Sequence, residues 1–286
     1  MPWDKTARDK YKRVDNDMQY DVTDEEWEVI KTFLPTQGSM GRPRKTGLRE
    51  VFHAIQSMLA TGCQWRAIPS CYPPFSTVQN YFYNWSQSGV LTDLMNDLRT
   101  QARRLADRSE EPRAAIIDSQ SVKTTESGGP RGYDAGKKIK GRKRHIMTDT
   151  TGAPLAIVIH PADVQDRDGA VDLILQVVAS SPTITKIWAD GGYRGPKLAS
   201  KLHELAIRPD LSIVLKPKDG KGFQVLFQRW IIERTFAWMG RCRRLAKDYE
   251  GSLASSLAWT TLAACRFLMR RIACDNGGMG LKCKAL

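Results

Sequence analysis

Apolar residues recur at helical spacing through the first third of the chain. The clearest stretch runs from Leu48 to Leu59 and is followed by Gly62, a residue that commonly ends a helix. An earlier helix is expected to begin at Thr23, because Glu26 stands three residues later and completes a capping box. Further helices are predicted over residues 76–85, with Ser76 as cap, and 91–105. We therefore predict a flexible basic arm over residues 1–20 and a small all-α domain over residues 21–107.

From residue 108 the pattern changes to short apolar runs separated by polar segments. Strands are predicted over residues 114–117, 145–148, 155–159, 184–189 and 213–215, and helices over 170–178, 197–205, 230–239 and 252–272. Residues 149–152 read as a hairpin turn between the second and third strands. The mixed order of strands and helices predicts an α/β domain over residues 108–274, followed by a flexible tail over residues 275–286.

Three acidic residues lie at or near the buried parts of the predicted strands and helices. Asp118 and Asp190 each follow a predicted buried strand, and Glu233 lies near the apolar side of a predicted helix. A lone Asp commonly starts a turn, and Glu233 could simply pair with Arg229 one helical turn earlier. Taken together, the three favour a metal site, because hard divalent cations prefer carboxylate oxygens. Two such ions can stabilise both the attacking and the leaving oxygen of a phosphodiester.

The charge balance indicates a polyanionic partner. Lys and Arg number 44 and Asp and Glu 31, giving a formal net charge of +13. Helix 76–85 could read DNA bases through Gln79, Asn80 and Asn84, although an ordinary bundle helix fits the pattern equally well. Basic residues that could hold DNA phosphates are Arg42, Arg44, Lys45, Lys137, Lys138, Lys140, Arg142, Lys143, Arg144 and Arg241.

Other chemistries lack their sequence signatures. The six cysteines include no C-x-x-C pair, and the chain has neither a G-x-x-x-x-G-K phosphate loop nor a G-x-S-x-G nucleophile motif. No apolar run approaches the roughly 20 residues that span a bilayer, and the first residues are not an apolar signal segment. We therefore expect a cytoplasmic protein, associated with the nucleoid when on DNA, and no membrane contact.

Six segments, in this order along the chain, resemble bacterial insertion-sequence transposases of the DDE type, in the IS-four/IS-five superfamily and closest to its IS-five-like members. They are Gly41–Lys45, Gly62–Arg66, Ile117–Lys123, Lys140–His145, Ala189–Gly195 and Arg229–Trp238. The resemblance implies an RNase H-like catalytic core and a helix-turn-helix-like domain that binds terminal inverted repeats. It implies that Asp118, Asp190 and Glu233 hold two Mg²⁺ or Mn²⁺ ions for strand cleavage and transfer. It also implies homodimers or larger assemblies on element ends and target DNA.

One part of the superfamily pattern is incomplete here. The superfamily often carries a Tyr, an Arg and a Lys around its Glu; Arg229 matches the Arg, but the Tyr position is Leu226 and the Lys position is Gly240. Arg229 is thus a candidate phosphate contact. Two alternatives to an active transposase stay open: a catalytically silent DNA-binding protein or repressor derived from one, and a related RNase H-like nuclease.

Overall fold

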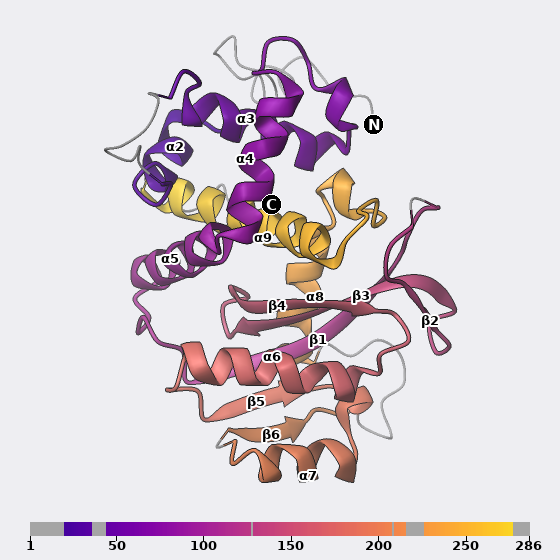
Figure 1. Ribbon diagram of the computed structural model, residues 1–286. Coiled ribbons are helices and arrows are strands. Elements are labelled where there is room, and N and C mark those ends of the chain that lie inside the picture. Colours follow the sequence, from indigo (N-terminus) through magenta and orange to yellow (C-terminus); the bar gives the residue numbers. More distant parts are fainter. Residues whose placement is uncertain (1–19, 36–43, 127, 208, 216–225, 277–286) are drawn as a thin grey trace, which may run out of the picture.

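A computed structural model describes residues 20–35, 44–126, 128–207, 209–215 and 226–276 (Figure 1). The predicted arm, apart from residue 20, and the last ten residues of the predicted tail lie outside these ranges, as does Arg42. Within the described part of the chain, no helix is long and apolar enough to cross a membrane.

The first part of the chain is helical, as the periodicity predicts. Its elements are α2 (Asp24–Ile30), α3 (Leu48–Thr61), the 3₁₀ turn η1 (Trp65–Ala67), α4 (Phe75–Gln87) and α5 (Val90–Leu105). The capping box forms, since Thr23 accepts from the backbone of Glu26 and the Glu26 side chain accepts from the backbone of Thr23. Gly62 ends α3 with a φ of 73°, a left-handed conformation that favours glycine.

Next come the strands and helices of a mixed sheet. They are β1 (Ala114–Lys123), β2 (Gly132–Asp134), β3 (Ile139–Asp149), β4 (Pro154–Pro161), α6 (Asp166–Ser180), β5 (Lys186–Ala189), η2 (Gly191–Tyr193), α7 (Pro196–Glu204), β6 (Asp210–Ile213), α8 (Phe227–Met239), η3 (Arg243–Leu245) and α9 (Leu253–Asn276). Strand β3 is antiparallel to both of its neighbours β1 and β4. On the other side of β1, β5 and β6 continue the sheet parallel to β1. This mixed sheet with its helices is the predicted α/β class.

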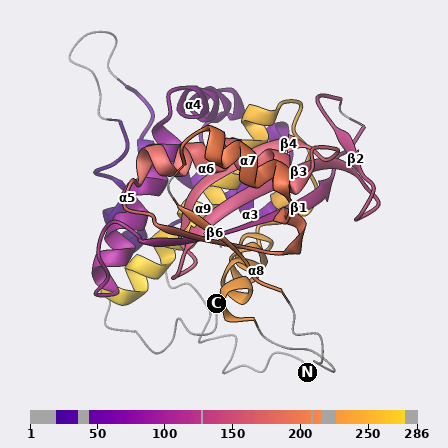
Figure 2. The ribbon, with the colours of Figure 1, turned by 90° about the horizontal axis from the view of Figure 1, so that it is seen from below.

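Helices cover both faces of this sheet (Figures 1 and 2). Helices α6 and α7 bury one face, in a core that includes Ala115 and Ile117 of β1. The opposite face packs against α8, where Ile116 meets Ile231 and Ile232. Since successive side chains of a strand point to opposite faces, residues of β1 with even numbers face α8 and those with odd numbers face α6.

The C-terminal helix α9 joins the helical part to the sheet. Its buried residues share one hydrophobic core with α2, α3, α4 and α5, and that core also includes Ile157 and Ile159 of β4. A helix that follows the sheet in sequence therefore packs among the helices that precede it (Figure 1). The division into domains at residues 107 and 108 stays a prediction.

Several sequence-based boundaries were wrong. The strand predicted over residues 145–148 begins at Ile139 as β3, and β2 was not predicted. Strand β1 does not end before Asp118 but continues to Lys123, because its later residues keep pairing with β3. The residues after Ile117 are polar and therefore do not look like a strand in the sequence. They can lie within the sheet because their side chains have partners on both faces. Helix α4 begins at Phe75 after Pro74, so Ser76 lies inside the helix and does not cap it.

The densest basic run also needs correction. Residues 140–144 belong to β3, and the side chains of Arg142, Lys143 and Arg144 are buried. Arg142 pairs with Asp248 at 2.9 Å, and Arg144 donates to the carbonyl of Leu245 at 3.0 Å. Buried charges require such partners. These three residues hold the fold together and do not offer their charge to DNA phosphates.

The ion pair between Arg142 and Asp248 should dominate the stability of this region. We expect Asp248→Ala to lower the free energy of unfolding by about 3–5 kcal/mol, because the Arg142 side chain is 0% exposed and would be left as an uncompensated buried charge. Urea unfolding at pH 7 measures the change. The control is Glu204→Ala, which removes the exposed ion pair with Lys201 and should change stability little. Equal effects of the two substitutions would contradict the assignment.

Candidate active site

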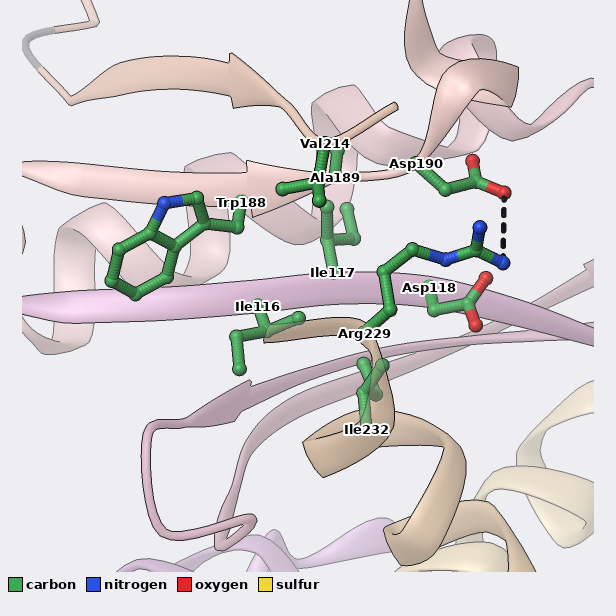
Figure 3. A pocket seen from close by; sticks show the side chains of 9 residues that line it. All are labelled: Ile116, Ile117, Asp118, Trp188, Ala189, Asp190, Val214, Arg229 and Ile232. Atoms are coloured by element: carbon green, nitrogen blue, oxygen red, sulfur yellow. Dashed lines mark ion pairs between the residues drawn. The ribbon is translucent and has the colours of Figure 1, made fainter. Parts of the chain in front are cut away.

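The sheet brings Asp118 and Asp190 together on the face covered by α8. Parallel pairing places Ile116 of β1 opposite Trp188 of β5. Two residues further along each chain segment stand Asp118 and Asp190, so the alternation of side chains directs both carboxylates to the same face as Ile116. Figure 3 shows them at one end of a shallow pocket. The pocket is lined by Ile116, Ile117, Asp118, Trp188, Ala189, Asp190, Val214, Arg229 and Ile232.

The Asp118 carboxylate is in an environment that disfavours its charge. The pKa of Asp118 is raised from 3.8 to about 6, mainly by burial and also by the neighbouring Asp190. The backbone amide of Ser119, which donates to Asp118 Oδ1 at 2.7 Å, and the cations of Lys137 and Arg229 act in the opposite direction. A carboxylate with a raised pKa beside a second carboxylate is typical of a functional site.

Asp190 lies in the turn that follows β5. Its Oδ1 accepts from the backbone amide of Gly192 at 2.8 Å, which fixes the side chain at the start of η2. Its Oδ2 lies 4.0 Å from Nη2 of Arg229 on α8. The short strand and the tight Gly191-Gly192 turn therefore hold this carboxylate beside Asp118.

Glu233 forms an ion pair with Arg229, which lines the pocket. The guanidinium of Arg229 lies 3.4 Å from Glu233 Oε1, one helical turn along α8, and 4.0 Å from Asp190 Oδ2. Glu233 itself is half-exposed and does not line the pocket. The structure thus gathers Asp118, Asp190 and Arg229 in the pocket, and Glu233 contacts this group through the Arg229 guanidinium.

Three carboxylates provide the oxygen donors that a hard divalent cation prefers. Among the described residues, however, no three His, Cys, Asp or Glu side chains lie close enough together to hold one metal ion. The guanidinium of Arg229 carries the compensating positive charge between Asp190 and Glu233 instead. The donor chemistry fits a divalent metal, provided that Arg229 moves away from the two carboxylates.

Several site residues were not singled out from the sequence. Asp166, at the start of α6, accepts from Ser119 Oγ at 2.7 Å, and Tyr193 is buried close to the acids. Burial raises the pKa of Tyr193, and Asp118, Asp166 and Asp190 raise it further, so the phenol stays neutral. The only sequence signal for Asp166 was its place in an acidic first helical turn, which many surface helices share.

The predicted DNA contacts lie on several surfaces. Lys137 is beside the site, because its Nζ donates to the carbonyl of Ser119 at 3.1 Å. Arg44 is partly buried over the Tyr81 ring, and Gln79 is partly buried on α4. The exposed candidates are Lys45, Asn80, Asn84, Lys137, Lys138, Lys140 and Arg241. Among the described candidates, only Arg142, Lys143 and Arg144 are fully buried.

The sequence matches two family models. Residues 109–268, which carry the whole sheet and both predicted aspartates, match the model described as "Transposase DDE domain". The chain belongs to the DDE transposase family. Residues 22–95 match a second model, described as "Putative transposase of IS4/5 family", so the helical part of this transposase is also a recognised component.

Two individual proteins are similar to parts of this DDE transposase. It is 29% identical over 164 residues to the "Putative transposase for insertion sequence element IS402" of Burkholderia cepacia, covering 54% of this chain and 73% of that one. It is 33% identical over 83 residues to the "Uncharacterized protein y4sN" of Sinorhizobium fredii, covering 28% of this chain and 65% of that one.

A solved structure, the "Crystal structure of the Mos1 Strand Transfer Complex", aligns with 84% of this chain and 81% of that chain at 11% identity. Its TM-score is 0.21, a value too low to support a shared fold.

Membership of the family settles the class of activity. DDE transposases are enzymes that cleave DNA and transfer its strands, and they depend on divalent metal ions. The substrate of this transposase is therefore DNA, which agrees with its net charge of +13.

The raised pKa of Asp118 has a measurable consequence for the metal-free transposase. In the folded state this carboxyl keeps its proton up to about pH 6, whereas the unfolded chain releases it near pH 3.8. Asp118 therefore destabilises the fold progressively as pH rises from about 4 to 6, and the penalty then stays constant. We expect Asp118→Asn to gain stability relative to wild type over this interval. Urea unfolding in EDTA measures it, and a difference that does not change with pH would contradict the burial.

Proposed function

We propose that this chain is the transposase of a bacterial insertion sequence. It binds the terminal inverted repeats of its element, cuts the DNA there and joins the freed ends to target DNA. Asp118, Asp190 and Glu233 form its acidic triad and hold two Mg²⁺ ions, with Mn²⁺ as a substitute. The observation that carries this proposal is the placement of Asp118 on β1 and of Asp190 directly after the adjacent parallel strand β5, facing the helix that bears Glu233.

The metal ions would supply an activated water and neutralise the charge that develops on the phosphate. The protein's own part is to hold the ligands. Asp118 is fixed within a strand paired on both sides, and Asp190 is fixed by the amide of Gly192. Glu233 is the movable ligand, since its half-exposed side chain lies on one helix and is bound only through Arg229 among the interactions described for it.

Arg229 would change partners as the site assembles. In the metal-free protein its guanidinium compensates Asp190 and Glu233. Once cations neutralise those carboxylates, the guanidinium is available for a phosphate oxygen of the DNA, for which its planar donors are well suited. Arg229 thus serves first as a counter-ion for the acids and then as a DNA contact.

The DNA-binding surface is proposed to extend from the site to the helical part. Lys137 lies beside Asp118, and the exposed Lys138, Lys140 and Arg241 add positive charge on the surface. Helix α4 presents Asn80 and Asn84 to solvent, where their amides can reach base edges. Two element ends must be joined in one reaction, so we propose a homodimer or larger assembly on DNA. Its substrate places it in the bacterial cytoplasm, at the nucleoid.

The triad is tested by cleavage of a labelled DNA that carries the element's end, with Mg²⁺ or Mn²⁺. We expect Asp118→Ala, Asp190→Ala and Glu233→Ala each to lower the cleavage rate about a thousandfold or more, because losing a metal ligand removes several kcal/mol of transition-state stabilisation. DNA binding should persist in all three. The matched control is Asp210→Ala, an exposed acid at the start of β6.

Each outcome has a clear meaning. Cleavage by the wild type and the control alone supports the triad. Cleavage by the triad variants at the wild-type rate overturns the site. Binding without cleavage by any variant, the wild type included, favours a silent DNA-binding protein, and cleavage that ignores the inverted repeat favours a nuclease.

Base reading and phosphate binding are separated by a second pair of variants. Asn84→Ala should weaken binding to the inverted repeat by about 1–3 kcal/mol and leave binding to random DNA unchanged, because it removes a base contact. Lys140→Ala should weaken both equally and reduce the slope of log affinity against log salt by about 1. Fluorescence anisotropy at several salt concentrations measures both. An Asn84→Ala variant that keeps its preference for the repeat would exclude α4 as the recognition helix.

A further inference from the structure

The face of β1 opposite to Asp118 also carries an organised polar contact. Ser119 points toward α6, and its hydroxyl donates to Oδ1 of Asp166 at 2.7 Å. Asp166 is the first residue of α6. This hydrogen bond therefore ties the start of that helix to the residue that directly follows Asp118 in the strand.

A buried lysine fixes the Asp166 carboxylate in place. The Lys143 side chain, only 6% exposed, sits on β3 with its Nζ 3.0 Å from Oδ1 of Asp166. The same ammonium donates to the carbonyl of Val164 at 2.8 Å and lies 3.5 Å from Asp134. Lys143 thus has oxygen partners on several sides, and such a buried charge pair has little freedom to move.

The other oxygen of Asp166 faces the turn that holds Asp190. A Cβ built on Gly192 would lie 3.3 Å from Asp166 Oδ2 and 3.1 Å from Asp190 Oδ1. Both carboxylates therefore close around the same glycine, the one whose amide donates to Asp190. A side chain at position 192 would have to displace one or both of them.

The first turn of α6 can come this close because of a second glycine. A Cβ on Gly169 would meet the ring of His145 on β3 at 2.5 Å, a distance that real side chains do not tolerate. The glycine lets α6 lie directly on the strand that carries Lys143. Glycine weakens a helix, but at this position it allows the close contact between α6 and β3 that positions Asp166.

We propose that Asp166 is a positioning residue of the active site: it links β1 next to Asp118 with the Gly192 turn next to Asp190, and so sets the separation of the two metal-holding carboxylates. Asp166 acts through Ser119 and Gly192. This inference rests on the proposed roles of Asp118 and Asp190. It adds a fourth acid, from a different element, that the triad does not include.

Asp166→Asn tests the inference, because the amide can still accept from Ser119 but no longer compensates Lys143. Binding of Mn²⁺ to the full chain without DNA is measured by calorimetry, together with DNA cleavage as a function of Mn²⁺ concentration. We expect the dissociation constant for Mn²⁺ to rise about tenfold or more, as it does when groups that orient metal ligands are lost. The matched control is Asp168→Asn, which removes an acid from the same helical turn that pairs with Lys197 at the surface.

Two further variants separate positioning from general stability. Ser119→Ala removes the hydrogen bond without touching a charge. Combined with Asp166→Ala, which already removes the acceptor, it should be no worse than Asp166→Ala alone, because both act on one link. Gly169→Ala should also weaken Mn²⁺ binding, because it displaces the start of α6 without removing any carboxylate. If Asp166→Asn is unfolded, the Ser119→Ala and Gly169→Ala measurements decide the question.

The outcomes distinguish this inference from the proposed function. One outcome overturns the role of Asp166 and leaves the triad intact: Asp118→Ala loses Mn²⁺ binding, whereas Asp166→Asn, Ser119→Ala and Gly169→Ala retain it. Asp118→Ala that still binds and cuts like wild type overturns the triad and, with it, this inference. Weaker binding in Asp166→Asn with an unchanged Asp168→Asn supports the link.

Discussion

The position of the active site depends on the pairing of strand β1. It pairs in parallel with β5 along its first residues and antiparallel with β3 along almost its whole length. Pairing on both sides fixes the register, and a shift of one residue would turn Asp118 from the α8 face to the α6 face. The same constraint sets Ser119 toward α6. The carboxylates that meet α8 and the polar contacts that support them from the other face are consequences of one strand register.

Buried charge is the second constraint, and two of the ion pairs that satisfy it join residues distant in sequence. Arg142 pairs with Asp248, and Lys143 pairs with Asp166. At the site the compensation is weaker, since Arg229 lies 4.0 Å from Asp190 and 3.4 Å from Glu233. These two ion pairs are close and largely buried, whereas those at the site are longer and more exposed. This difference suits a site that must exchange a guanidinium for cations when it binds DNA.

Local sequence patterns predicted most of the elements but not the partners of their polar side chains. Periodicity and capping predicted the helices, and the apolar run before Asp118 predicted the start of β1. The end of β1 was missed because polar residues in a strand look like a loop when their partners, such as Asp166 and Asp134, are unknown. The basic run of β3 was misread for the same reason, as Asp248 lies 106 positions after Arg142. The triad itself remains a prediction that the fold makes geometrically reasonable.

The most direct test of the account is to locate bound metal in the folded protein. Anomalous diffraction from crystals of the full chain grown with Mn²⁺ and element-end DNA would show each ion. The account predicts Mn²⁺ within about 2.0–2.3 Å of carboxylate oxygens of Asp118 and Asp190, with Glu233 contributing and the Arg229 guanidinium turned away toward DNA. Ions bound elsewhere, with Arg229 still between Asp190 and Glu233, would contradict it.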